Sequence, residues 1–110
     1  METNRVGHLS ALSSLSALAQ ESRLEVFRLL VQAGASGLPA GDIAKRLKIP
    51  ASSLSFHLNN LAQGLLINST REGRSIIYSA NFDQMRGLVA YLLENCCAGE
   101  CGANTRDASV

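Results

Sequence analysis

Prolines and aromatic residues are scarce in this sequence. Of its 110 residues only two are prolines, none is tryptophan and 5% are aromatic, whereas 46% are hydrophobic. Such a composition excludes a disordered chain and favours a helix-rich globular fold. Because this length provides one small core, we expect one domain over residues 1–102 and a disordered polar tail over 103–110.

A long apolar run and a large excess of one charge are also missing. No stretch approaches the ~20 apolar residues that span a bilayer, and the first residues lack the pattern of a signal peptide. We therefore expect a cytoplasmic protein. A net charge of +1 excludes nucleic-acid binding by bulk positive charge. The charge is uneven, however, since residues 42–78 carry five basic and two acidic side chains.

Apolar residues recur at helical spacing over residues 8–19, 21–33, 39–47, 52–63 and 82–93. Two extended runs, 65–70 and 75–79, flank Arg71-Glu72-Gly73-Arg74, where glycine supplies the positive φ of a hairpin turn. The predicted fold is therefore mainly α, with about five helices and a small two-stranded β-hairpin. This order of elements is typical of a winged helix-turn-helix, in which the fourth helix reads DNA.

The fourth predicted helix has one apolar side, formed by Leu54, Leu58 and Leu61, and short polar side chains elsewhere. Short polar side chains contact base edges and phosphates, and basic ones on the third helix and the hairpin contact the backbone. The predicted DNA-binding residues are Lys45, Arg46, Lys48, Ser52, Ser53, Ser55, Phe56, His57, Asn60, Arg71 and Arg74. Three alternatives stay open: Ser52 as a helix cap, His57 as a structural histidine, and the hairpin tip as a solvated turn.

These motifs resemble the ArsR/SmtB family of bacterial metalloregulators over roughly residues 9–93. The matching motifs are Ser52-x-x-Ser55-x-His57-Leu58-x-x-Leu61, Gly64-Leu65-Leu66, Arg71-x-Gly73-Arg74-x-x-x-Tyr78, Ala19-Gln20-Glu21-Ser22-Arg23-Leu24 and Asp42-Ile43-Ala44. The resemblance implies a homodimer joined by its first and last helices. It also implies a repressor that binds double-stranded operator DNA and releases it when metal binds. A dimer agrees with the leucine stripes on both terminal helices, which exceed what a small monomer buries.

Cysteine is absent until Cys96, Cys97 and Cys101, which fall within six positions. In a reducing cytoplasm we expect them to be thiols and not a disulfide framework. Three cysteines without a neighbouring histidine match the three thiolates that trivalent arsenic or antimony prefers, whereas zinc takes four ligands. Adjacent side chains on a helix diverge by about 100°, so Cys96 and Cys97 can share one ion only if the helix ends there.

The cysteine pattern departs from that of the family. Residues 38–44, where many members carry a Cys-x-Cys arsenic site, contain no cysteine, and the ligands of the zinc sensors on the last helix are missing. We therefore predict a repressor of an arsenic-resistance operon that responds to As(III), or to Sb(III) or methylarsenite, through Cys96, Cys97 and Cys101. The main alternative is a thiol redox-sensing winged-helix repressor; shared structural zinc and incidental cysteines are others.

Catalysis is not expected. The sequence shows no set of nucleophile, base and orienting residue and no glycine-rich phosphate loop. We predict neither an enzyme nor a catalytic cofactor.

Overall fold

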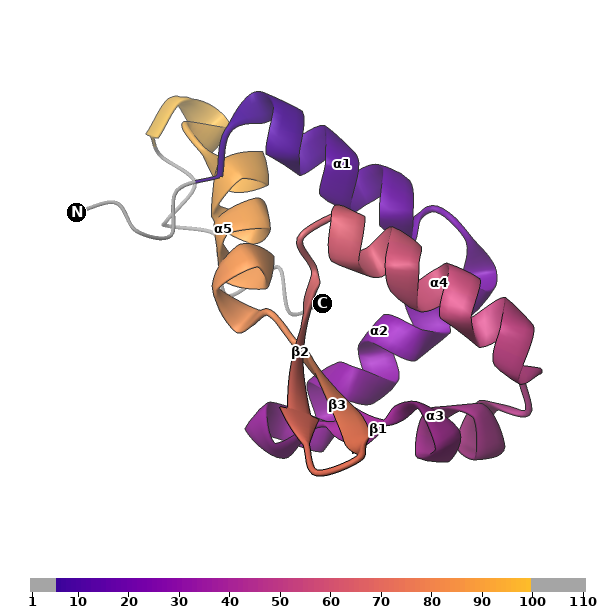
Figure 1. Cartoon of the computed structure of the whole chain (residues 1–110). Coiled ribbons are helices and arrows are strands. Elements are labelled where there is room, and N and C mark those ends of the chain that lie inside the picture. The colour runs from indigo at the N-terminus through magenta and orange to yellow at the C-terminus, as the bar shows by residue number, and fades with distance from the viewer. Residues whose placement is uncertain (1–5, 100–110) are drawn as a thin grey trace.

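The computed structural model describes residues 6–99. Its helices are α1 (His8–Leu18), α2 (Glu21–Ala33), α3 (Ala40–Leu47), α4 (Ala51–Gln63) and α5 (Phe82–Leu93). Its strands are β1 (Leu38–Pro39), β2 (Ile67–Glu72) and β3 (Ser75–Ala80), and two 3-10 turns lie at Gly34–Ser36 and Cys96–Gly99. This arrangement confirms the predicted winged helix-turn-helix (Figure 1). None of the helices within residues 6–99 is long and apolar enough to cross a bilayer.

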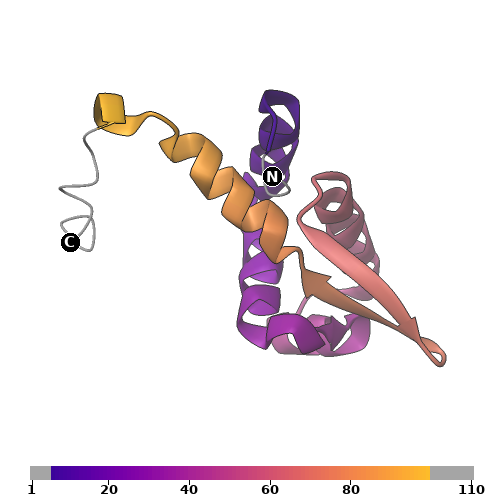
Figure 2. The ribbon, with the colours of Figure 1, turned by 90° about the vertical axis from the view of Figure 1, so that its left-hand side faces the viewer.

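The β-hairpin of β2 and β3 forms the wing, which projects from the side of the molecule opposite α5 (Figure 2). Its turn is tighter than predicted, because Glu72 pairs directly with Ser75 and leaves only two residues between the strands. Gly73 takes the first of these positions with φ +62°, the conformation for which glycine was expected. The strand β2 begins at Ile67 and not at Leu65, because Leu65 adopts φ +66° in the turn that closes α4.

The sheet has a third strand that the sequence did not predict. Strand β1 pairs antiparallel with β3, with Leu38 opposite Tyr78, so the strand order is β1-β3-β2. This pairing attaches the wing to the segment that leads into α3.

The core lies between α2, α3, α4 and the base of the wing. Leu54, Leu58 and Leu61 all face it, as predicted from their spacing. Full burial of a leucine side chain contributes about 1.5–3 kcal/mol. The three leucines therefore fix the rotation of α4 about its own axis, and with it the side of this helix that faces solvent.

Helix α1 packs through small residues, not through its leucines. Ala11, Ser14 and Ala17 are its buried residues, whereas Leu9 is 78% exposed and Leu12 is 51% exposed. The small residues therefore lie on the inner side of α1 and the leucine stripe on its outer side. They let α1 come close to α4, since a Cβ on Gly64 would meet the Cβ of Ala17 at 2.9 Å.

A buried hydroxyl joins three helices. Ser14 Oγ donates to the carbonyl oxygen of Gly64 at 2.6 Å and accepts from Nε2 of Gln84 at 3.0 Å. Asn81 extends this network: its Oδ1 accepts from the backbone N–H of Gln84, and its Nδ2 donates to the carbonyl of Leu65. The end of α4 is thus hydrogen-bonded to both α1 and the start of α5.

Replacing Ser14 by alanine is expected to destabilise the fold by about 1–3 kcal/mol, because it leaves a buried carbonyl and a side-chain amide without their partner. Urea denaturation followed by circular dichroism measures the change. Ser16→Ala, at an exposed position of the same helix, is the matched control and should stay within about 0.5 kcal/mol of the native protein. Equal stability of the two variants would show that the network contributes nothing.

Candidate DNA-binding surface, apolar face and cysteine segment

The outer face of α4 is the first candidate surface. Ser52, Ser53, Ser55 and Phe56 are all exposed on it, and the Phe56 side chain is 62% exposed. None of the serines caps the helix, so the alternative reading of Ser52 as a cap is wrong. The N-cap is Pro50, whose extended backbone starts the helix without a side-chain hydrogen bond. The serine hydroxyls are therefore left available to an external partner.

His57, also predicted to contact DNA, lies on the buried side of α4 and not on this outer face. The side chain is only 9% exposed, and its buried Nδ1 has no hydrogen-bond partner in the described part of the chain. It is three residues after Leu54 and four before Leu61, so it flanks the buried side of α4. Burial, and then the charge of Arg23, lower the pKa of His57, which therefore stays neutral at pH 7.

Asn59 is a further residue of this outer face. It is exposed and lies seven residues after Ser52 and three after Phe56, so helical spacing places all three on one side. Asn60, which was predicted, is partly buried, and its Nδ2 donates to the carbonyl of Phe56 at 2.9 Å.

The predicted basic residues of α3 and the following turn are all exposed: Lys45, Arg46 and Lys48. Lys48 ends α3 in a left-handed conformation, with φ +57°. Arg46 also borders a groove between α2 and α3 that Glu21 and Glu25 line. Those carboxylates reduce the positive potential around Arg46, so Lys45 and Lys48 are the stronger candidates for backbone contact.

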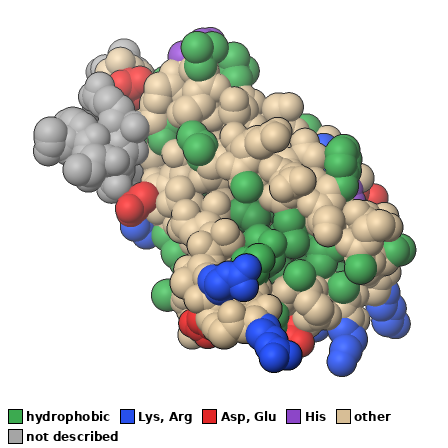
Figure 3. All heavy atoms as spheres, viewed as in Figure 1, with side chains coloured by type: hydrophobic (Ala, Val, Ile, Leu, Met, Phe, Trp, Pro, Cys, Tyr) green, Lys and Arg blue, Asp and Glu red, His purple; other side chains and the backbone are tan. Residues whose placement is uncertain are grey.

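The wing carries the remaining predicted cations. Arg71 and Arg74 are exposed, and neither pairs with a carboxylate within residues 6–99. Figure 3 shows Lys and Arg side chains along the lower edge of the molecule, over the wing and α3. A helix with polar side chains and basic groups beside it can enter a major groove while the wing contacts the flanking backbone.

A second surface, the apolar face, is formed by α1 and α5, which lie side by side (Figure 1). The two helices are joined by a hydrogen bond of 2.7 Å between Nδ1 of His8 and the Tyr91 hydroxyl. Ala11 and Leu88 are buried between them with Val6. The large side chains that remain exposed on these helices are Leu9, Leu12, Leu15, Val89, Leu92 and Leu93.

The cysteine segment follows α5 directly. The helix ends at Leu93, and Asn95 and Cys97 both have positive φ, which meets the condition that Cys96 and Cys97 not lie on a regular helix. Cys97 has a free, exposed thiol, whereas Cys96 is half-buried and disulfide-bonded. We expected three free thiols because we assumed a reducing compartment. The disulfide at Cys96 departs from that expectation.

Cys101 lies outside the described residues, as does the tail at 103–110. Within residues 6–99 no three His, Cys, Asp or Glu side chains group as a metal site. Since the predicted arsenic site includes Cys101, it stays a prediction.

Known transcriptional regulators are similar to this chain in sequence. A helix-turn-helix domain model matches residues 18–70. The transcriptional repressor SdpR of Bacillus subtilis (strain 168) is 32% identical over 77 residues, which are 70% of this chain and 82% of that protein. The transcriptional activator HlyU of Vibrio cholerae serotype O1 is 28% identical over 78 residues, covering 71% and 69% of the two chains.

Solved structures agree with the sequence comparison. An ArsR-like transcriptional regulator from Rhodococcus sp. RHA1 superimposes with a TM-score of 0.71 and 28% identity, covering 93% of this chain and 90% of that one. HlyU from Vibrio cholerae N16961 gives a TM-score of 0.62 at 27% identity, with coverage of 86% and 98%. The chain belongs to the ArsR family of winged helix-turn-helix proteins and is a DNA-binding transcriptional regulator, not an enzyme.

Proposed function

We propose that this protein is a homodimeric repressor of an arsenic-resistance operon, which leaves its operator when trivalent arsenic or antimony binds Cys96, Cys97 and Cys101. The observation that carries the proposal is the position of the cysteine segment, immediately after the helix that contributes half of the apolar face. An ion bound there acts on the packing of α5, and a second subunit packed on α5 responds to it.

The apolar face supports the dimer. Six large hydrophobic side chains on two adjacent helices form a patch that a monomeric protein seldom exposes. A second copy of the chain covers it by two-fold symmetry and places two α4 helices for successive major grooves. The proposed partners are therefore a second subunit and double-stranded operator DNA.

The chemistry of the site requires reduced cysteines. Each As–O bond of arsenous acid is replaced by an As–S bond, and the three thiol protons leave with the three hydroxyl groups as water. The disulfide at Cys96 must therefore be reduced before three thiolates are available. Methylarsenite, which has two exchangeable oxygens, needs only two of the thiols.

The hydrogen-bond network around Ser14 supports a route from α5 to the DNA. Gln84, in the first turn of α5, is bonded to Ser14, and Ser14 is bonded to the residue that ends α4. A shift of α5 that changes these bonds moves α4 relative to the partner's recognition helix. A coupling of about 1–3 kcal/mol between inducer and DNA changes the affinity for operator by 5- to 150-fold.

A thiol redox switch is the second candidate function, and the disulfide at Cys96 is the observation that favours it. In that case oxidation itself, and not an ion, reorganises the segment after α5.

The variant Cys96→Ser/Cys97→Ser is expected to bind operator DNA as the native protein does and to lose release by arsenite completely. Fluorescence anisotropy of a labelled operator fragment, titrated with arsenite in the presence of a non-thiol reductant, measures both properties. The outer face of α4, including Ser52 and Ser55, is unchanged in this variant. A native affinity for operator therefore shows that the variant is correctly folded.

Three results would overturn the arsenic assignment. The first is release of the double variant by arsenite, which would place the inducer elsewhere. The second is native protein that ignores arsenite and antimonite but leaves DNA on adding peroxide, which would establish the redox switch instead. The third is native protein that leaves operator DNA on adding zinc but not on adding arsenite.

A further inference from the structure

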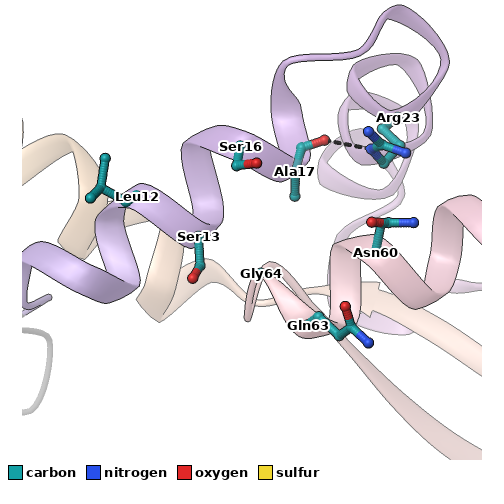
Figure 4. Close-up of a pocket in the computed structure, with 8 residues that line it drawn as sticks. All are labelled: Leu12, Ser13, Ser16, Ala17, Arg23, Asn60, Gln63 and Gly64. Atoms are coloured by element: carbon teal, nitrogen blue, oxygen red, sulfur yellow. Dashed lines mark hydrogen bonds between the residues drawn. The ribbon is translucent and has the colours of Figure 1, made fainter.

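A polar pocket of about 350 Å³ lies between α1, α2 and the C-terminal half of α4 (Figure 4). It is lined by Leu12, Ser13, Ser16, Ala17, Arg23, Asn60, Gln63 and Gly64. Four of these side chains carry hydroxyl or amide groups, one is a guanidinium, and none is a carboxylate. Because Arg23 is the only charged side chain among these lining residues, the pocket is suited to an anion.

The guanidinium of Arg23 is held in place but not neutralised. Its Nε donates to the carbonyl oxygen of Ala17 at 2.8 Å, and its backbone N–H donates to the side chain of Gln20. No carboxylate within residues 6–99 pairs with it, and its two terminal nitrogens have no partner there. A fixed guanidinium with free terminal N–H groups is pre-organised for a phosphate oxygen pair.

The pocket adjoins the outer face of α4. Gln63 is exposed and lies seven residues after Phe56 and four after Asn59, so it belongs to the same side of the helix. Gln63 also lines the pocket. In Figure 1 the wing lies on one side of α4 and the end of α1 on the other. When α4 enters a major groove, the wing can reach the DNA backbone on one side and the pocket can reach it on the other.

We infer that this pocket binds a backbone phosphate of operator DNA, with Arg23 as the charged ligand and Ser13, Ser16 and Gln63 as neutral donors. The inference rests on DNA binding by this family and adds a contact that the sequence motifs did not indicate. Because phosphate contacts carry no base information, the pocket sets the position of α4 in the groove and not its sequence preference.

The test is the salt dependence of DNA affinity, measured for the full chain on operator and on unrelated duplex DNA. Each lost phosphate contact lowers the slope of log Kobs against log[salt] by about 0.9, so Arg23→Gln should lower it by about 1.8 for a dimer. The affinity should fall by the same factor on both DNAs. Arg28→Gln removes the same charge from an exposed position of α2, at the groove beside α3, and should leave the slope unchanged.

Arg23→Lys separates the phosphate contact from the hydrogen bond that Arg23 donates to the carbonyl oxygen of Ala17. It keeps the charge, so the native slope should return even though the bond from Nε to Ala17 is lost. If Arg23→Gln has the native slope, or if Arg23→Lys changes it as much as Arg23→Gln does, the inference is wrong. A native protein that binds no DNA would instead disprove the underlying function.

A free phosphate ion is the alternative ligand for this pocket, because it has the same chemistry as a backbone phosphate. Inorganic phosphate is titrated against chloride at equal ionic strength while the Arg23 side-chain resonance is followed by NMR. Saturation at low millimolar phosphate, with an unchanged slope for Arg23→Gln, would assign the pocket to a small anion and overturn the DNA contact.

Discussion

The variant Leu92→Glu is expected to be monomeric and to bind operator DNA about 100-fold or more weakly than the native protein. Leu92 is 58% exposed on the apolar face, where a partner subunit would bury it. A carboxylate at this position has no partner in an apolar interface and opposes its own copy across a two-fold axis. Losing the dimer removes the effective concentration by which binding of one α4 helps the other.

Analytical ultracentrifugation and operator anisotropy on the same samples measure this effect. The matched control is Leu24→Glu, which places the same charge at a leucine of α2 that is also exposed but lies outside the apolar face. The control should remain dimeric and bind DNA normally. If Leu92→Glu stays dimeric, or if it becomes monomeric with unchanged operator affinity, the proposed assembly is wrong.

The wide agreement between predicted and observed helices has a simple physical cause. Leu54, Leu58 and Leu61 repeat at the helical period, and burial of that one stripe determines the orientation of every other residue on α4. The serines and Phe56 were therefore correctly placed on the exposed side before any tertiary information was available. The same logic, carried seven residues beyond Phe56, also places Gln63 on this side.

His57 shows where this logic stops. It lies at the edge of the leucine stripe, and whether an edge position is covered depends on the helices packed beside it, not on α4. Arg23, on α2, is close enough to lower its pKa, so that neighbour comes from a segment more than thirty residues away. Periodicity within one helix contains no information about such a neighbour.

Strand β1 was missed for a related reason. Two residues are too few to show an alternation of apolar and polar side chains, and the strand exists because Leu38 and Pro39 lie against β3. The leucines of α1 were recognised as a stripe, but their spacing alone could not tell a core-facing side from one reserved for another subunit. The arsenic site is different again, because its chemistry depends on the reduced state and on Cys101, neither of which the described structure contains.

The variant Gly37→Ala is expected to lose about 2–6 kcal/mol of stability, because two costs of about 1–3 kcal/mol each coincide at this position. Gly37 has φ +68° and ψ −169°, a conformation that essentially only glycine adopts. In addition, a Cβ there would overlap the carbonyl oxygen of Tyr78 and meet Cγ2 of Ile77 at 3.0 Å. Both contacts are with β3, so the chain must separate β1 from the wing to accommodate one methyl group.

Gly41→Ala makes the same chemical change without either cost. Gly41 lies on α3 with ordinary φ and no atom within 4 Å of its Cβ position, so alanine should stabilise the helix by about 0.5–1 kcal/mol. Urea denaturation of both variants measures the difference. Because β1 joins the wing to the segment before α3, Gly37→Ala should also weaken operator binding at temperatures where it is still folded. Equal stabilities for the two alanine variants would show that the β1–β3 pairing does not constrain the wing.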